Sequence, residues 1–128
     1  MIEYMAEDNR INNFGIPIRN RSFYEAAFKD GAWINLDAKS TTYTGRLVNY
    51  FPKLSLIILN PFIGSVYSSD GARKFELINR DLEIDLVYSD IISKSRTTEE
   101  EANNRVKSYN LDAEISRKIQ LGQLLRNS

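Results

Sequence analysis

The sequence predicts a mainly β protein with flanking helices: a short helix, a small barrel of about five strands, and one or two C-terminal helices. An apolar stripe at helical spacing covers residues 22–30. Alternating and β-branched segments then run from Trp33 to residue 94, and helical periodicity returns after Thr98. Short strands joined by tight turns favour closure into a barrel over an open sheet.

The chain divides into three parts where the pattern changes. Residues 1–21 have no clear period and end in a stretch rich in Asn, Gly and Pro, so we expect an irregular segment. Residues 22–95 hold the helix and the barrel, and residues 96–128 form a helical extension. A chain of 128 residues is the expected size for one domain with a modest appendage.

The first helix is predicted to begin at Ser22. Ser22 and Glu25 have the spacing of a capping box, in which the serine oxygen accepts a backbone N–H and the glutamate reaches back. Asp30-Gly31 is expected to end the helix, because glycine tolerates the left-handed conformation found there. The apolar stripe of this helix consists of Phe23, Ala26, Ala27 and Phe28.

The strands are predicted from alternation and from β-branched and aromatic residues. The main segments are residues 33–36, 41–50, 54–59, 82–88 and 91–94. Gly45 marks a bend, a bulge or a close backbone approach within its strand. Asn60-Pro61 is expected to end the strand before it, and the turn sequence SSDG at 68–71 predicts a hairpin between residues 63–67 and 74–78.

The C-terminal extension is predicted to be helical. Thr98 and Glu101 form a second capping box, and the acidic residues of that first turn suit the helix dipole. A last helix is expected to start near Asp112. One face of it carries Leu111, Ile115, Ile119, Leu121 and Leu125. Gly122, near the centre of this face, either lets the helix approach a neighbour closely or is simply tolerated.

The composition excludes several kinds of chemistry. The chain has no His and no Cys, so it cannot build a Cys/His zinc site, a thiol nucleophile or a Ser-His-Asp triad. We therefore expect a protein that is not an enzyme and uses no cofactor. Seventeen basic residues balance seventeen acidic ones, unlike the basic excess of an indiscriminate DNA binder. No apolar segment approaches the roughly 20 residues of a membrane helix, so we expect a soluble, cytoplasmic protein.

Three carboxylates alternate along one predicted strand: Asp81, Glu83 and Asp85. Side chains two residues apart share a face, and carboxylates on one face can bind a divalent cation. A carboxylate-based, metal-dependent hydrolase is therefore one hypothesis. The more common meaning of such a pattern is the solvent-exposed face of a half-buried strand.

The segment GRLVNYFPKLSLIIL resembles the first Sm motif of Sm and Sm-like (LSm) proteins, Gly-x-Leu-x-x-aromatic-Asp-x-x-Met-Asn-Leu-x-Leu. The matching residues are Gly45, Leu47, Tyr50, Leu56 and Ile58, with Leu54 in place of the Met. The segment IDLVYSDIISKS resembles the second Sm motif, with Asp90-Ile91 near its end. The similarity covers residues 20–95 and implies an SH3-like barrel of the Sm type behind an N-terminal helix.

In that family, polar positions of the two motifs form a pocket for a base of single-stranded RNA, and here they are replaced. Phe51 stands in place of the Asp, Ser55 in place of the base-reading Asn, and Val87-Tyr88 in place of Arg-Gly. Because the Asp and the Arg brace each other, their joint loss avoids an unpaired buried charge. The resemblance therefore implies an altered uridine pocket.

The residues that remain for RNA are Lys53, Phe51, Ser55 and Tyr88, with the lysine near phosphate and the aromatic rings stacking on bases. The alternative for Phe51 and Tyr88 is that they only fill space. Secondary phosphate contacts are expected from Arg19, Arg21, Arg73 and Lys74, unless these are simply solvated surface.

The resemblance also implies a homo-oligomeric ring in which the fourth and fifth strands of neighbouring subunits pair. Open sheet edges give this pairing a physical motive. The expected interface residues are Leu82, Ile84, Leu86, Val87, Ile91 and Ile92. The leading hypothesis is an Sm-like ring protein of RNA metabolism that binds RNA or scaffolds a ribonucleoprotein. The alternative is a protein–protein interaction or structural module on the same barrel, without RNA.

Overall fold

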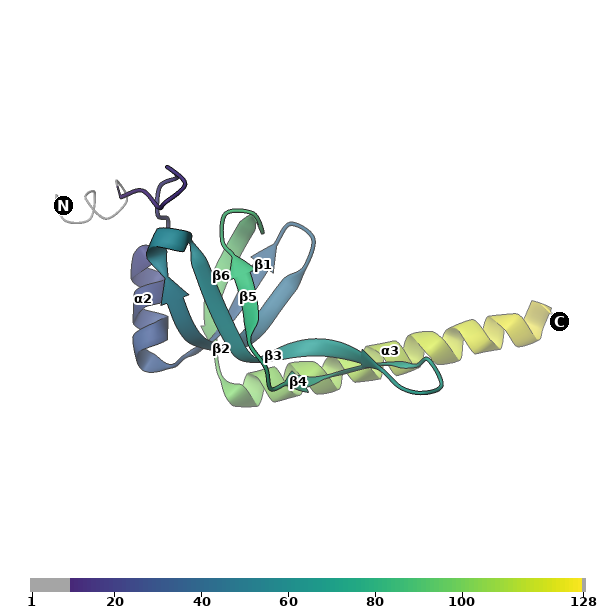
Figure 1. Ribbon diagram of the computed structural model, residues 1–128. Helices are drawn as coiled ribbons and strands as arrows, with labels where there is room; N and C mark the ends of the chain where they lie inside the picture. The colour runs from purple at the N-terminus through teal and green to yellow at the C-terminus, as the bar shows by residue number, and fades with distance from the viewer. Residues whose placement is uncertain (1–9, 128) are drawn as a thin grey trace.

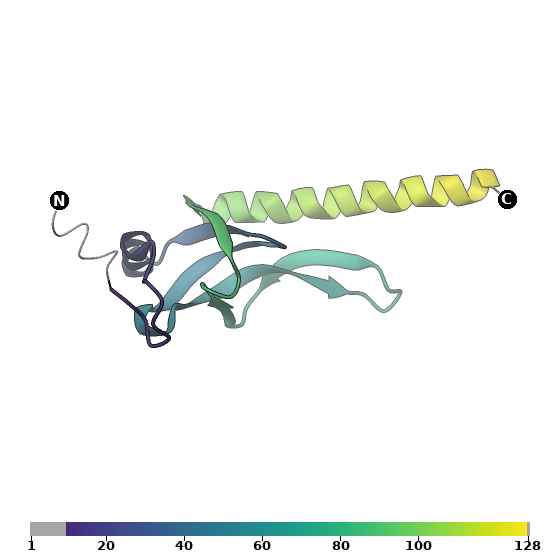
Figure 2. The same cartoon turned by 90° about the horizontal axis from the view of Figure 1, so that it is seen from above.

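A bent antiparallel sheet carries a short helix at one end and a long helix that extends past the sheet (Figures 1 and 2). The computed structural model describes residues 10–127. The elements are α2 (Arg21–Asp30), β1 (Trp33–Ala38), β2 (Thr42–Phe51), the 3-10 turn η1 (Pro52–Leu54), β3 (Leu56–Tyr67), β4 (Arg73–Ile78), β5 (Leu82–Asp85), β6 (Ile91–Thr97) and α3 (Glu99–Asn127). The prediction of a mainly β protein with flanking helices is confirmed.

The sheet has six strands in the order β4-β3-β2-β1-β6, with β5 also paired to β3. The predicted count of five is therefore wrong. In the pairing of residues 10–127, β6 lies against β1 alone and β5 against β3 alone. The predicted closure into a barrel is thus not shown by strand pairing.

The long strand β3 serves two partners in succession. Its first part, Leu56–Leu59, pairs with β5, and its second part, Phe62–Tyr67, pairs with β4. Asn60-Pro61 does not end the strand, contrary to the prediction. Pro61 falls between the two partners and at a register shift against β2, so its missing N–H costs no ladder hydrogen bond.

Gly45 is the point where β2 passes closest to β3. A Cβ atom there would lie 2.6 Å from the carbonyl oxygen of Pro61 and 3.0 Å from Cβ of Leu59. The register between the two strands shifts on the next residues of β2. Of the three alternatives predicted for this glycine, the structure shows a close backbone approach, next to a register irregularity.

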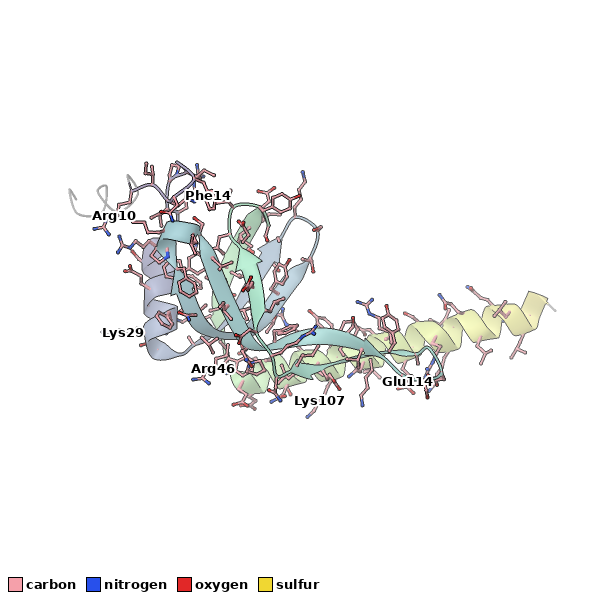
Figure 3. The ribbon with its side chains drawn as sticks, viewed as in Figure 1. Arg10, Phe14, Lys29, Arg46, Lys107 and Glu114 are labelled. Carbon is pink, nitrogen blue, oxygen red and sulfur yellow. The ribbon has the colours of Figure 1, made fainter. Side chains whose placement is uncertain are left out.

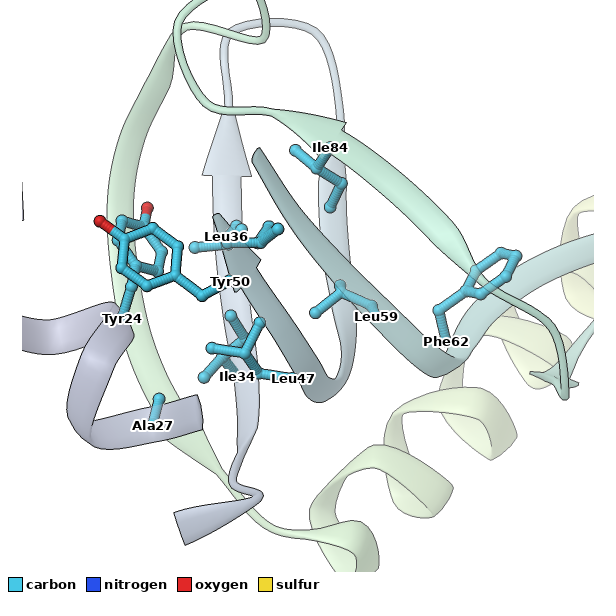
Figure 4. Close-up of a cluster of buried hydrophobic side chains, with 10 residues drawn as sticks. Tyr24, Ala27, Ile34, Leu36, Leu47, Tyr50, Leu59, Phe62 and Ile84 are labelled. Carbon is cyan, nitrogen blue, oxygen red and sulfur yellow. The ribbon is translucent and has the colours of Figure 1, made fainter. Parts of the chain in front are cut away.

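The hydrophobic core lies between the curved sheet and α2 (Figure 4). Its buried members are Tyr24, Ala27, Ile34, Leu36, Leu47, Tyr50, Ile57, Leu59, Phe62 and Ile84. Alternate residues of β1 and β3 point inward, as the two-residue period of a strand requires. Full burial of one such aliphatic side chain contributes about 1.5–3 kcal/mol.

Helix α2 begins one residue before the predicted start, and Ser22 is not its N-cap. Asn20 takes that position with φ of 59° and no capping hydrogen bond from its side chain, while Glu25 pairs with Arg21. The buried face is also different, because Tyr24 and Ala27 point inward and Ala26 and Phe28 are exposed. The end at Gly31 is as predicted, with its N–H donating to the carbonyl of Phe28.

Helix α3 is one continuous helix of 29 residues, so the predicted new start at Asp112 is wrong. Its first turn is capped as expected, since the N–H of Glu101 donates to Oγ1 of Thr98 over 3.1 Å. The Glu101 carboxylate also accepts from the hydroxyl of Thr97. No helix within residues 10–127 has the length and apolar composition needed to cross a bilayer.

The first half of α3 covers the outer edge of β4. The side-chain amide of Asn110 accepts from the backbone N–H of Phe75 over 2.7 Å and donates to its carbonyl over 2.9 Å. The rings of Tyr109 and Phe75 lie 5.2 Å apart beside this pair. One side chain therefore satisfies both outward-facing backbone groups of an edge residue, as a further strand would.

We predict that Asn110→Ala lowers the free energy of unfolding by about 1–2 kcal/mol, because two hydrogen bonds to the β4 edge are lost. Urea denaturation measures the loss, and hydrogen exchange at the Phe75 amide should accelerate. Asn103→Ala, at an exposed position of the same helix, is the matched control. Equal stability of the two variants would show that the edge does not depend on Asn110.

Candidate functional site

The turn between β2 and β3 and the turn between β5 and β6 lie against each other. The N–H of Leu86 donates to the carbonyl of Ser55 over 2.8 Å and joins the two turns. Ser55 and Asp90 both have left-handed backbone conformations, with φ of 49° and 55°, which reverse the chain within few residues. The two turns lie within the segments that resemble the Sm motifs, residues 45–59 and 84–95.

The second of these turns replaces the end of a predicted strand. Strand β5 stops at Asp85, three residues short of the predicted 82–88. The Asp85 carboxylate accepts the backbone N–H groups of Val87 and Tyr88 over 3.0 and 2.9 Å. An aspartate that bonds its own following backbone favours a turn over an extended strand.

A cavity of about 280 Å³ lies between the two turns and the N-terminal end of α2. Its apolar lining comes from residues on both sides, including Ile16, Ile18 and Ile91. Its polar lining consists of Arg19, Asn20, Tyr24, Tyr50, Ser55 and Asp90. The cavity therefore offers one cation, one carboxylate and several uncharged hydrogen-bonding groups beside two aromatic rings.

Two tyrosines from different elements meet at this cavity. The rings of Tyr24 on α2 and Tyr50 on β2 lie 5.5 Å apart, and their hydroxyls point in the same direction (Figure 4). Tyr24 is only 2% exposed. Burial, with a further contribution from Tyr50, raises the pKa of Tyr24 to about 12. Its hydroxyl is therefore uncharged at neutral pH and can both donate and accept a hydrogen bond.

The N-terminal segment, residues 10–18, folds over the turn between β2 and β3 (Figure 3). The buried Asn12 donates from Nδ2 to Oγ of Ser55 over 2.7 Å. Its Oδ1 accepts the N–H groups of Phe14 and Ile16, which fixes the segment around it. A second contact runs from the N–H of Asn13 to the carbonyl of Lys53 over 2.7 Å.

The four residues predicted to bind RNA are not brought together. Ser55 lines the cavity, but it is 6% exposed and its hydroxyl accepts from Asn12. Phe51, Lys53 and Tyr88 are exposed and lie outside the cavity lining. Tyr88 is 91% exposed, so it does not fill space in the fold.

Sequence reasoning missed most of the polar cavity residues. The sequence predicts Arg19 only as a secondary phosphate contact, and it predicts no binding role for Asn20, Tyr24 or Asp90. Tyr24 has one available signal, since an aromatic residue with a polar tip in an amphipathic helix often places the tip at the rim of a core. The role of Asn12 depends on a contact with a residue 43 positions away, which no local pattern indicates.

The other expected phosphate contacts are scattered. Arg21 forms an ion pair with Glu25. Arg73 and Lys74 line a separate cavity of about 480 Å³ between the start of β4 and helix α3, together with Arg117. Arg73 also lies over the ring of Phe75, 4.7 Å from its centroid.

The residues expected at a subunit interface divide into two groups. Ile84 is 2% exposed and belongs to the core, and the half-buried residues Leu82, Leu86 and Ile91 pack against it. Val87 and Ile92 are exposed. Ile92 is the extra residue at a register shift between β6 and β1, which directs it away from the core.

The three alternating carboxylates do not form a metal site. Asp81 accepts a hydrogen bond from Asn60, and Asp85 holds the following turn. Within residues 10–127, no group of three or more His, Cys, Asp or Glu residues is arranged to hold a metal ion. The hypothesis of a carboxylate-based hydrolase therefore has no site to support it.

No protein-family model matches this sequence, and no curated protein matches it either.

We predict that Tyr24 makes the fold sensitive to alkaline pH. Because its folded-state pKa of about 12 lies above the usual value of 10.0, its contribution to stability is complete below pH 10 and is lost as the pH rises toward 12. The expected loss is about 2 kcal/mol. Unfolding free energies of wild type and Tyr24→Phe between pH 9 and 12 measure it.

In this experiment Tyr24→Phe should show a shallower decline than wild type. Tyr67→Phe, which changes a tyrosine that is 70% exposed, is the control and should follow wild type. Identical pH profiles of all three proteins would contradict the prediction.

Proposed function

We propose that this chain is an Sm-like subunit of a homo-oligomeric ring in RNA metabolism, and that it binds single-stranded RNA with one nucleotide in the cavity beside Tyr24 and Tyr50. One observation carries the proposal. The two turns that contain the Sm-like motifs, far apart in sequence, converge on a cavity that has aromatic, cationic and hydrogen-bonding residues in its lining.

The architecture supports the same proposal. A helix precedes the strands, and β4 and β5 follow each other in sequence with a break at residues 79–81. Both lie along β3, and β6 returns to β1 at the other side of the sheet. Gly45 and Tyr50, which match the first motif, have the close approach and the core position that a structural role requires.

The size and charge of the cavity favour a single nucleotide. Ligand sites commonly have volumes of about 300–1,000 Å³, so a cavity of about 280 Å³ suits one small ligand. Asn20 and the Tyr24 hydroxyl can bond the edge of a base. Because Asp90 would repel a phosphate inside the cavity, we place the base inside and the phosphate outside, near the exposed Arg19.

Sheet edges support the ring. Strand β5 uses one edge on β3, and β6 uses one edge on β1, so each has a second edge that the pairing of residues 10–127 does not use. The edge of β4, by contrast, is covered by Asn110 of α3. Pairing of β5 with β6 of a neighbouring subunit would satisfy both remaining edges.

We predict that wild type binds oligo-U or oligo-A at low salt, and that Arg19→Ala weakens binding about tenfold because a phosphate contact is lost. Filter binding with both oligonucleotides at low and moderate salt measures the effect. Lys29→Ala, at the opposite end of α2 from the cavity (Figure 3), is the matched control. Lys53→Ala should have a smaller effect than Arg19→Ala, because Lys53 lies outside the cavity lining.

Two results would contradict the RNA site. Equal losses for Arg19→Ala and Lys29→Ala would indicate general electrostatic attraction. Absence of binding to either oligonucleotide at low salt would favour the alternative function, a protein–protein interaction or structural module on the same fold.

We predict that Ile92→Asp breaks the ring into smaller species, because a charge then faces the neighbouring edge at a position that is 71% exposed in the single chain. Native mass spectrometry measures the change in mass. Ser95→Asp is the control. Ser95 is also exposed and lies on the same strand, but it is in register with Asn35 of β1, whereas Ile92 has no register partner there. A strictly monomeric wild type at micromolar concentration would overturn the ring.

A further inference from the structure

The C-terminal half of α3 exposes a stripe of aliphatic side chains on one face. We define the stripe as Leu111, Ile115, Ile119, Leu121 and Leu125, together with Gly122 at its centre. Its large side chains are 46–69% exposed. Soluble monomers rarely leave several adjacent aliphatic residues in water, and such patches commonly mark an interaction site.

The stripe faces away from the sheet. On a helix with about 100° between residues, its members span an arc of about 160° centred near Leu111 and Gly122. The side of α3 that contacts the sheet carries Ala102, Tyr109 and Ala113, on the opposite side of the helix. Packing on the subunit's own sheet therefore does not explain the stripe.

The end of the helix also extends beyond the sheet. Figures 1 and 2 show the last turns of α3 past the tip of the β3–β4 hairpin. The cavity between that hairpin and α3 ends at Gln120. Short helices without tertiary contacts are marginal in water, so a partner that covers the stripe would stabilise these turns.

The charges beside the stripe match a second copy of this chain in the antiparallel direction. Asp112 and Arg126 lie on the same flank of the stripe, near its opposite ends. In an antiparallel pair, the same flanks face each other, so Asp112 of each chain lies near Arg126 of the other. In a parallel, in-register pair, opposite flanks face each other and Asp112 is level with Asp112, so Asp112 and Arg126 would not meet.

The shapes match in the same register. An antiparallel pair that brings Asp112 beside Arg126 also places Ile115 opposite Gly122 of the second copy. Nothing lies within 4 Å of the position that a Cβ of Gly122 would occupy, so the glycine leaves room for a large side chain. Lys118 and Glu114 lie within the arc of the stripe, on the flank opposite Asp112 and Arg126, and pair with each other over 3.3 Å.

We propose that the apolar stripe of α3 binds the same stripe of a second copy as an antiparallel helix pair. Ile115 packs over Gly122, and Asp112 pairs with Arg126 at each end. The contact is separate from the sheet edges. If the ring of the proposed function forms, the helix pairs join subunits of two rings; if it does not, they give a dimer.

The stripe is tested with the full chain by light scattering after size exclusion. Wild type at micromolar concentration should have twice the mass of the Ile115→Glu/Leu125→Glu variant. Leu124→Glu is the matched control, because Leu124 is 68% exposed but lies outside the stripe. It should keep the wild-type mass. Ile92→Asp changes only the sheet-edge contact, so the helix pair should remain as a dimer. Loss of the ring and loss of the helix pair therefore give different masses.

The direction of the pair is tested by charge reversal at two exposed residues. Asp112→Arg and Arg126→Asp should each raise the dissociation constant of the helix pair about three- to tenfold, and the double variant should restore it. Analytical ultracentrifugation provides the constants. Restoration is expected only if the two residues meet across the interface.

Several results would overturn the proposal. These are a wild-type mass that Ile115→Glu/Leu125→Glu does not change, an equal effect of Leu124→Glu, or no recovery in the double charge reversal. Binding of wild type to phosphatidylserine vesicles, with no self-association in solution, would instead assign the stripe to a membrane surface and would equally overturn the pair.

Discussion

The close passage of β2 over β3 at Gly45 is the constraint on which the rest of the structure depends. Because Gly45 has no Cβ, the backbone of β3 at Pro61 and Phe62 can lie within van der Waals distance of β2, where the register between the two strands shifts. The first part of β3 then leads back to β5 and the cavity, while the second part forms the hairpin that α3 covers. A single position thus separates the half of the sheet with the candidate site from the half with the long helix.

The edge strands of the two halves of the sheet differ in how their backbone hydrogen-bonding groups are satisfied. On the β4 side, Asn110 completes the hydrogen bonding of Phe75 within the same chain. On the β5 and β6 side, the turn residues and the N-terminal segment line the cavity or fold over it, and the pairing of residues 10–127 leaves one edge of each strand unused. The proposed assembly and the proposed RNA contact therefore use neighbouring parts of one surface, whereas the stripe of α3 lies far from both.

Much of the fold could be predicted from the sequence, because local chemistry decides it. The helix end at Gly31, the cap at Thr98, the hairpin turn before β4 and the role of Gly45 each depend on a few neighbouring residues. The continuity of β3 through Pro61 and of α3 through Asp112 could not be predicted, because each depends on partners elsewhere in the chain. The cavity could not be predicted for the same reason: Tyr24, Tyr50 and Asp90 line one cavity only after three distant segments pack.

Because α3 is unbroken, the distance from the sheet contact to the C-terminal end of the helix is fixed, and so is the rotation of that end about the helix axis. From Asn110, held on the sheet, to Arg126 near its end, the helix rises about 24 Å at 1.5 Å per residue. One residue inserted between them would rotate everything beyond it by about 100° and leave the sheet contact untouched. A partner bound at the C-terminal end of α3 would therefore lie at a fixed distance from the sheet and at a fixed rotation about the helix axis.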